Sequence, residues 1–130
     1  FLGVCMGMQA LFEVSEEGGS HECLGVLPGR IVRFPHGLKV PHMGWNTVTA
    51  RRAHPLLKDL ALGETGLHAY FVHSYHFRPR DAEAIVAEVD YGGPLTAMIG
   101  RDNIAGVQFH PEKSQSLGLK LISNFLRWSP

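Results

Sequence analysis

The first nine residues, FLGVCMGMQ, restrict the fold more than any other stretch of the chain. An apolar run ends just before Cys5, and apolar residues at helical spacing follow it. A strand that turns abruptly into a helix forces the residue at the turn into a strained backbone conformation, and Gly3 and Gly7 would relieve the collisions there. We therefore predict a strand end, a sharp turn at Cys5 and a helix from Met6 to about Glu16.

Short β-prone segments recur through the rest of the chain, separated by Pro, Gly, Asp or Asn. We predict strands at 29–34, 45–49, 67–77, 84–91, 95–100 and 104–110, a short helix at 55–60 and a closing helix at 116–128. The closing helix would carry five apolar residues on one face: Leu117, Leu121, Ile122, Phe125 and Leu126. Helices at both ends of a block of strands favour an α/β sheet that is covered on both faces.

Composition excludes several classes of function. Lys plus Arg and Asp plus Glu are both 12, with no basic stripe, so the sequence lacks the charge pattern of a nucleic-acid binder. No run is long enough to span a bilayer and no signal peptide is recognised, so we expect no membrane partner. Two cysteines in 130 residues suit a reducing compartment, and we expect a cytoplasmic protein. Because the chain starts inside an apolar run without a Met, we interpret it as a fragment.

The segment Gly3-Val4-Cys5-Met6-Gly7 has the form G-x-C-x-G, the thiol version of a nucleophile elbow. A helix N-terminus favours the thiolate of Cys5, and the backbone N–H of Met6 would face a developing oxyanion. The alternative is that Cys5 is a small buried hydrophobic residue. Cys23 follows a polar loop without an elbow, and we expect it to be structural.

His110 is the candidate base for this thiol. It ends the apolar segment IAGVQF and is followed by Pro111 and Glu112, whose carboxylate could hold one imidazole nitrogen. Both Cys5 and His110 would lie at the carboxyl ends of strands, where catalytic groups of parallel sheets gather. These residues predict a Cys-His-Glu triad. An alternative zinc site would use His21 and Cys23, or His73 and His76, but neither pair has a partner pair at finger spacing. The remaining histidines are expected to be surface or packing residues: His36, His42, His54 and His68.

GVCMGMQ (3–9) together with GVQFHPEKS (106–114) resembles the class I, or triad, glutamine amidotransferases. LKVPHMGWN (38–46) and YFVHSYHF (70–77) look like the branch of that family formed by glutaminase subunits of imidazole glycerol phosphate synthase, in histidine biosynthesis. The resemblance implies a flavodoxin-like mixed sheet flanked by helices. It also implies that residues 1–130 are the C-terminal part of a single glutamine amidotransferase domain that lacks its N-terminal strands.

The resemblance assigns a role to each matching position. Cys5 would attack the carboxamide of glutamine, His110 would move protons, and Glu112 would hold His110. The family's positions for binding the substrate correspond to Met6, Gly7, Gln9, Ser74 and Tyr75. No cofactor and no metal are implied.

The resemblance also implies a protein partner, a barrel-shaped cyclase subunit that receives the ammonia. The positions that would contact it are Met43, Trp45, Asn46, Tyr70 and Lys113. The alternative is that PHMGWN packs on its own core and that Lys113 is simply solvated.

The chain departs from the family in one respect. In the family, a stretch before the elbow at Gly3–Gly7 supplies a second oxyanion donor, and this sequence does not include that stretch. We therefore expect the isolated 130 residues to be inactive and poorly folded. Two alternatives remain: a glutaminase domain of another synthase, such as those for anthranilate or guanine nucleotides, and a non-catalytic docking module.

Overall fold

The computed structural model describes residues 1–34 and 37–130, so the prediction for His36 lies outside the described residues. The strands are β1 (Leu2–Val4), β2 (Val14–Ser15), β3 (His21–Glu22), β4 (Gly29–Arg33), β5 (His42–Ala50), β6 (His68–His73), β7 (Tyr75–Pro79), β8 (Ile85–Asp90), β9 (Pro94–Arg101) and β10 (Ile104–Val107). The helices are α1 (Met6–Gln9) and α2 (Gln115–Arg127), with 3₁₀ turns at Pro55–Leu57, Ala82–Ala84 and Pro111–Lys113.

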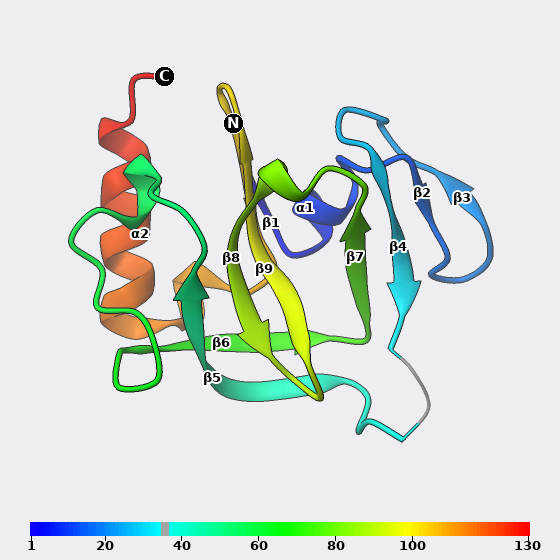
Figure 1. The fold of residues 1–130 in the computed structure, drawn as a ribbon, viewed down its shortest axis with the longest axis horizontal. Coiled ribbons are helices and arrows are strands. Elements are labelled where there is room, and N and C mark those ends of the chain that lie inside the picture. The colour runs from blue at the N-terminus through cyan, green and yellow to red at the C-terminus, as the bar shows by residue number, and fades with distance from the viewer. Residues whose placement is uncertain (35–36) are drawn as a thin grey trace.

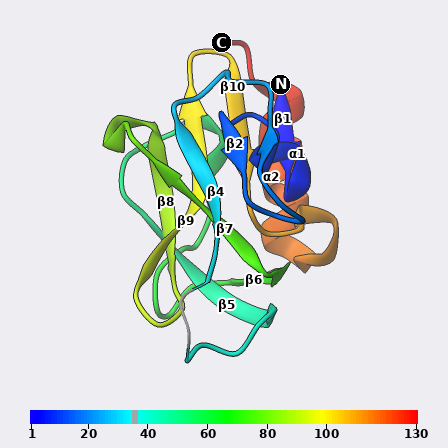
Figure 2. The ribbon, with the colours of Figure 1, turned by 90° about the vertical axis from the view of Figure 1, so that its right-hand side faces the viewer.

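The strands form two sheets, and Figure 1 shows α2 beside the larger sheet with the smaller sheet on the opposite side of the molecule. The six-stranded sheet has the order β1-β10-β9-β8-β5-β6, in which only the β1–β10 pair is parallel. The four-stranded sheet has the order β3-β2-β4-β7. Seen from the side, β1 and β10 run next to each other in front of α2 (Figure 2).

Two apolar cores lie on the two sides of the larger sheet. The first contains Leu117 and Leu121 of α2 packed with residues of β5, β6, β8, β9 and β10. The second joins Met8 of α1 to the smaller sheet, and it includes Ile99 of β9, although the neighbouring Met98 belongs to the first core. The prediction of a sheet covered on both faces is therefore confirmed, with α2 on one face and α1 with the smaller sheet on the other.

The predicted helix from Met6 to Glu16 is wrong beyond Gln9. After one turn of helix, the Glu13 N–H donates to the Gly29 carbonyl and the Glu16 N–H donates to the Ile31 carbonyl, so the segment joins β4. The apolar spacing that suggested a helix instead marks residues of the second core, Leu11 and Phe12. Pairing with a distant strand outweighed the local pattern, as tertiary contacts often do.

The other predictions differ mainly in their boundaries. The strand predicted at 45–49 extends over His42–Ala50, the segment 67–77 is two strands separated at Ser74, and the helix predicted at 55–60 is only a 3₁₀ turn. The closing helix is confirmed within one residue at each end. Leu126, however, is 78% exposed. At about 100° per residue it lies roughly 140° around the helix from the buried Leu121, so it cannot share that face.

Candidate active site

The turn at Cys5 has the strained geometry that the motif predicts. Cys5 has φ 51° and ψ −108°, a region that residues other than glycine rarely adopt, and its N–H donates to the Val107 carbonyl at 2.8 Å. A Cβ on Gly3 would lie 2.7 Å from the Gly7 oxygen, so strand and helix approach closely only because residue 3 is glycine. The same explanation is wrong for Gly7, because a Cβ there would have no atom within 4 Å.

Burial opposes the predicted preference for the thiolate in this structure. Burial raises the pKa of the Cys5 thiol, and the opposing effects of the Met6 N–H and the Gln108 side chain only partly offset it. The carboxylates of Glu17 and Glu112 raise the same pKa further. One turn of helix is a weak dipole, so a neutral thiol that must be deprotonated during the reaction fits this site better than a resting thiolate.

His110 is held in place at its backbone and at its ring. Its N–H donates to the Tyr70 carbonyl at 2.9 Å, and its carbonyl accepts from Ser114 Oγ at 2.6 Å. The ring Nδ1 lies 2.6 Å from Glu112 Oε1. Because a carboxylate accepts the proton of Nδ1, the other ring nitrogen, Nε2, is left unprotonated and able to act as a base.

A cavity of about 500 Å³ brings the thiol and the imidazole together. It is lined by Val4, Cys5, Met6, Gln9, Glu17, Pro41, Val72, His73, Ser74, Tyr75 and His110. Six of the eight predicted catalytic and substrate-binding residues line it. Gly7 does not, and Glu112 reaches the cavity only through His110.

Sequence reasoning missed two ionisable residues of this cavity, Glu17 and His73. The helix predicted to reach Glu16 would put Glu17 just past its end, but the chain has already left the helix and places Glu17 at the cavity. The sequence suggests for His73 only the role of a zinc ligand. In the described part of the chain, no three His, Cys, Asp or Glu side chains gather closely enough to hold a metal ion.

His73 belongs to a buried pair with His42. His42 Nδ1 and His73 Nε2 are 3.0 Å apart, and His73 Nδ1 donates to the Tyr75 carbonyl at 2.9 Å. His42 stacks between Phe71 and Tyr91, so its predicted packing role is confirmed. Burial lowers the pKa of both histidines to about 4, which keeps them neutral at physiological pH.

The predicted partner contacts lie on β5, on β6 and after His110. Trp45 is 49% exposed and packs edge-to-face on Tyr70, and Lys113 Nζ lies 5.8 Å from the centre of the Tyr70 ring. Met43 is also exposed. The side chain of Asn46 is engaged within the chain, since its amide donates to the Asp90 carbonyl and its Oδ1 accepts from the Thr47 N–H.

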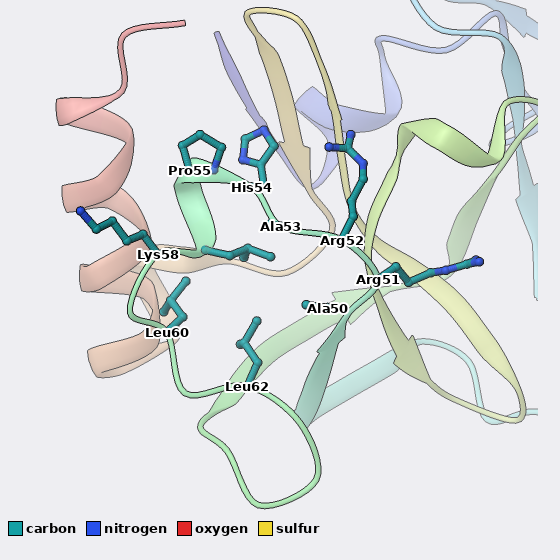
Figure 3. A pocket seen from close by; sticks show the side chains of 10 residues that line it. Ala50, Arg51, Arg52, Ala53, His54, Pro55, Lys58, Leu60 and Leu62 are labelled. Carbon is teal, nitrogen blue, oxygen red and sulfur yellow. The ribbon is translucent and has the colours of Figure 1, made fainter.

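A second, wider cavity is lined by residues within 50–62, the end of β5 and the segment that follows it, and it does not include the thiol (Figure 3). Its apolar walls include Leu60 and Leu62, whereas the side chains of Arg51 and Arg52 point away from these leucines. Arg51 pairs with Glu88, and Arg52 donates to backbone carbonyls. None of the residues predicted to act in catalysis lines this cavity, so we place the candidate site at Cys5.

Within residues 1–34 and 37–130, no helix has the length and apolar character needed to cross a membrane.

Comparison with known proteins adds independent information. The model of the family described as "Glutamine amidotransferase class-I" matches residues 1–128. A protein of Rhodospirillum rubrum named "Imidazole glycerol phosphate synthase subunit HisH" is 54% identical, over 100% of this chain and 61% of its own length. Proteins with the same name from Desulfitobacterium hafniense and Rhizobium meliloti are 52% and 53% identical, over 98% and 100% of this chain and 59% and 62% of their own lengths. The chain thus spans about 60% of the length of these curated relatives.

Solved structures confirm the predicted fold class. "Structure of PurLQS from Thermotoga maritima" matches with a TM-score of 0.69 at 19% identity, over 97% of this chain and 60% of that one. A putative GMP synthase protein from Thermoplasma acidophilum matches with a TM-score of 0.65, also at 19% identity, over 97% of this chain and 55% of that one. At this identity the likeness concerns the fold alone.

Proposed function

We propose that this chain, which belongs to the class-I glutamine amidotransferase family, hydrolyses glutamine to glutamate and ammonia. We further propose that it does so as the glutaminase subunit of imidazole glycerol phosphate synthase. Residues 1–130 then form the C-terminal part of one amidotransferase domain.

The observation that carries the proposal is the shared cavity of Cys5 and His110. Cys5 is held at a strained turn, and His110 is oriented by Glu112 through a 2.6 Å hydrogen bond. A nucleophile, a base and a group that orients the base are the three parts that acyl transfer to a thiol requires.

In the first half of the reaction, Cys5 Sγ forms a bond to the side-chain carbonyl carbon of glutamine while His110 Nε2 takes the thiol proton. The Met6 N–H, which already contacts the sulfur, stabilises negative charge on the substrate oxygen. When the carbonyl re-forms, the C–N bond breaks and the proton on Nε2 passes to the leaving nitrogen. The products are ammonia and a γ-glutamyl thioester on Cys5.

In the second half, His110 Nε2 takes a proton from water as the water oxygen attacks the thioester carbon. The C–S bond then breaks and the proton returns to Cys5, which releases glutamate. Throughout both halves, Glu112 keeps the imidazole in one tautomer and stabilises the imidazolium.

The other lining residues suit the amino-acid end of glutamine. Glu17 brings a carboxylate to the same cavity as the thiol, where it can pair with the substrate's α-ammonium group. Gln9, Ser74 and Tyr75 line the same cavity and also contact this end of the substrate, and the backbone of Gly7 follows in the same helical turn as Gln9.

The names of the curated relatives support a partner, since each is a subunit of a synthase. We propose that a cyclase subunit docks on the surface formed by Met43, Trp45, Tyr70 and Lys113, with Asn46 at its margin, and receives the ammonia. Aromatic residues with an adjacent cation are typical of interface anchors. Both cysteines are free thiols, which supports the cytoplasm as the site of action.

The test is ammonia release from glutamine by the full-length protein, measured with and without the cyclase partner and its ribonucleotide substrate. We expect Cys5→Ala to lose activity by several orders of magnitude and Cys23→Ala, the matched control, to keep it. Equal activity of Cys5→Ala and the parent, or no activity with a competent cyclase, would overturn the proposal.

A further inference from the structure

Gln108 is a buried polar residue that the mechanism above does not use. It follows β10, its side chain is fully buried, and its backbone N–H donates to the Ala97 carbonyl. Its side-chain amide lies between two residues of the site: Nε2 is 3.5 Å from Cys5 Sγ, and Oε1 is 3.0 Å from Gln9 Nε2. A buried amide in an apolar core is costly unless both of its ends are bonded, and here both are.

The direction of this hydrogen-bond chain is set by the Tyr75 carbonyl. A carbonyl can only accept, so the Gln9 atom 3.2 Å from it must be the amide nitrogen. One proton of that nitrogen goes to Tyr75, and the other faces Gln108, whose nearer atom must then be its oxygen. The remaining end of Gln108, the NH₂ group, therefore points at Cys5 Sγ.

Two further contacts stabilise the same arrangement. His73 Nδ1 also donates to the Tyr75 carbonyl, so both lone pairs of this oxygen are occupied and no further donor can bind it. The Val72 carbonyl lies 4.0 Å from Cys5 Sγ on the acceptor side of the thiol. The sulfur thus has an acceptor for its proton and, besides the Met6 N–H, a side-chain donor for its lone pairs, which is Gln108.

We propose that Gln108 is a positioning residue with two functions: its N–H holds Cys5 Sγ ready for attack, and its oxygen fixes Gln9 so that Gln9 Oε1 faces the substrate. Both protons of the Gln9 amide are used inside the protein, so only its acceptor oxygen is left. That oxygen suits the α-ammonium group of glutamine. This second function rests on the proposed glutaminase activity, whereas the contact with the thiol does not.

The thiol contact is tested by the pH profile of Cys5 alkylation with iodoacetamide, in full-length protein carrying Cys23→Ser so that one cysteine remains. Gln108→Glu keeps an acceptor for Gln9 but has no donor for the sulfur, and Gln108→Met, which is unbranched and similar in volume, removes both. Gln115→Glu is the matched control at an exposed glutamine. We expect both Gln108 variants to be alkylated at least about tenfold more slowly at neutral pH, which corresponds to a shift of one pKa unit. The control should superimpose on the parent.

Steady-state glutaminase kinetics with the cyclase present separate the two functions. We expect Gln108→Glu to lower kcat with little change in KM, because Gln9 stays anchored, and Gln108→Met to raise KM as well. A purely structural role would lower the melting temperature without moving the alkylation profile. A folded variant of either kind with the parent's alkylation profile overturns the proposal. A shifted profile in a protein without glutaminase activity would instead refute only the proposed function.

Discussion

Replacing Gly118 with alanine tests whether α2 determines the position of the catalytic histidine. A Cβ at position 118 would lie 2.5 Å from the Pro111 carbonyl carbon and 2.9 Å from its Cα, and closer still to the carbonyl oxygen. Non-bonded carbons approach to about 3.5 Å, so the helix and the turn after His110 would have to separate by roughly 1 Å. Pro111 follows His110 directly, so this displacement reaches the base.

Two opposing effects decide the magnitude. Alanine is a better helix former than glycine by about 1 kcal/mol, which favours the variant. Overpacking of a buried contact costs about 1–3 kcal/mol, and more when backbone atoms collide. Because backbone atoms collide here, the upper part of that range applies, about 2–3 kcal/mol, and we expect a net loss of about 1–2 kcal/mol, or roughly 4–8 °C in Tm. A displacement of about 1 Å at a catalytic group can also reduce kcat on the order of a hundredfold.

Thermal unfolding and glutaminase kinetics of Gly118→Ala measure the two effects. Gly7→Ala is the matched stability control, because Gly7 is also helical and a Cβ there meets no atom within 4 Å. The control should be as stable as the parent or slightly more stable. Parental Tm and kcat in Gly118→Ala would refute the idea that contact between α2 and the turn positions His110.

Three further predictions concern stability. Burial lowers the pKa of His42 and His73 from 6.5 to about 4, so their contribution is complete above pH 6.5 and is lost as the pH falls toward 4. His42→Phe should reduce the slope of unfolding free energy against pH in that window by about 1.4 kcal/mol per unit, with no change of slope above pH 7, as measured by urea unfolding. Gly3→Ala, whose Cβ would meet backbone at 2.7 Å, should lower the free energy of unfolding by about 1–3 kcal/mol in the same assay. Asn124→Leu removes the amide that donates to two backbone carbonyls and should cost about 1–3 kcal/mol. An unchanged pH slope would contradict the first prediction, and a variant as stable as the parent would contradict the second or the third.

The sequence predicted those parts of the site that depend on neighbours along the chain. The strained turn at Cys5 follows from the glycine at position 3, and the hydrogen bond between His110 and Glu112 spans a single proline. The strand-end argument also predicted that the two groups would meet. The parallel pairing of β1 with β10, with Val4 opposite Val107, places both at the same edge of the sheet.

Tertiary structure alone decided the rest, because these features depend on contacts between distant residues. The helix after Cys5 ends early because β4 pairs with the chain that follows it, and the same pairing moves Glu17 to the cavity. Burial by surrounding elements, and not the local helix, determines the direction of the Cys5 pKa. The link from Gln108 to Gln9 and Cys5 joins residues about a hundred positions apart. A glutamine at the end of an apolar strand carries no local sign of its partners, since a hydrogen bond depends on distance in space and not on spacing in the sequence.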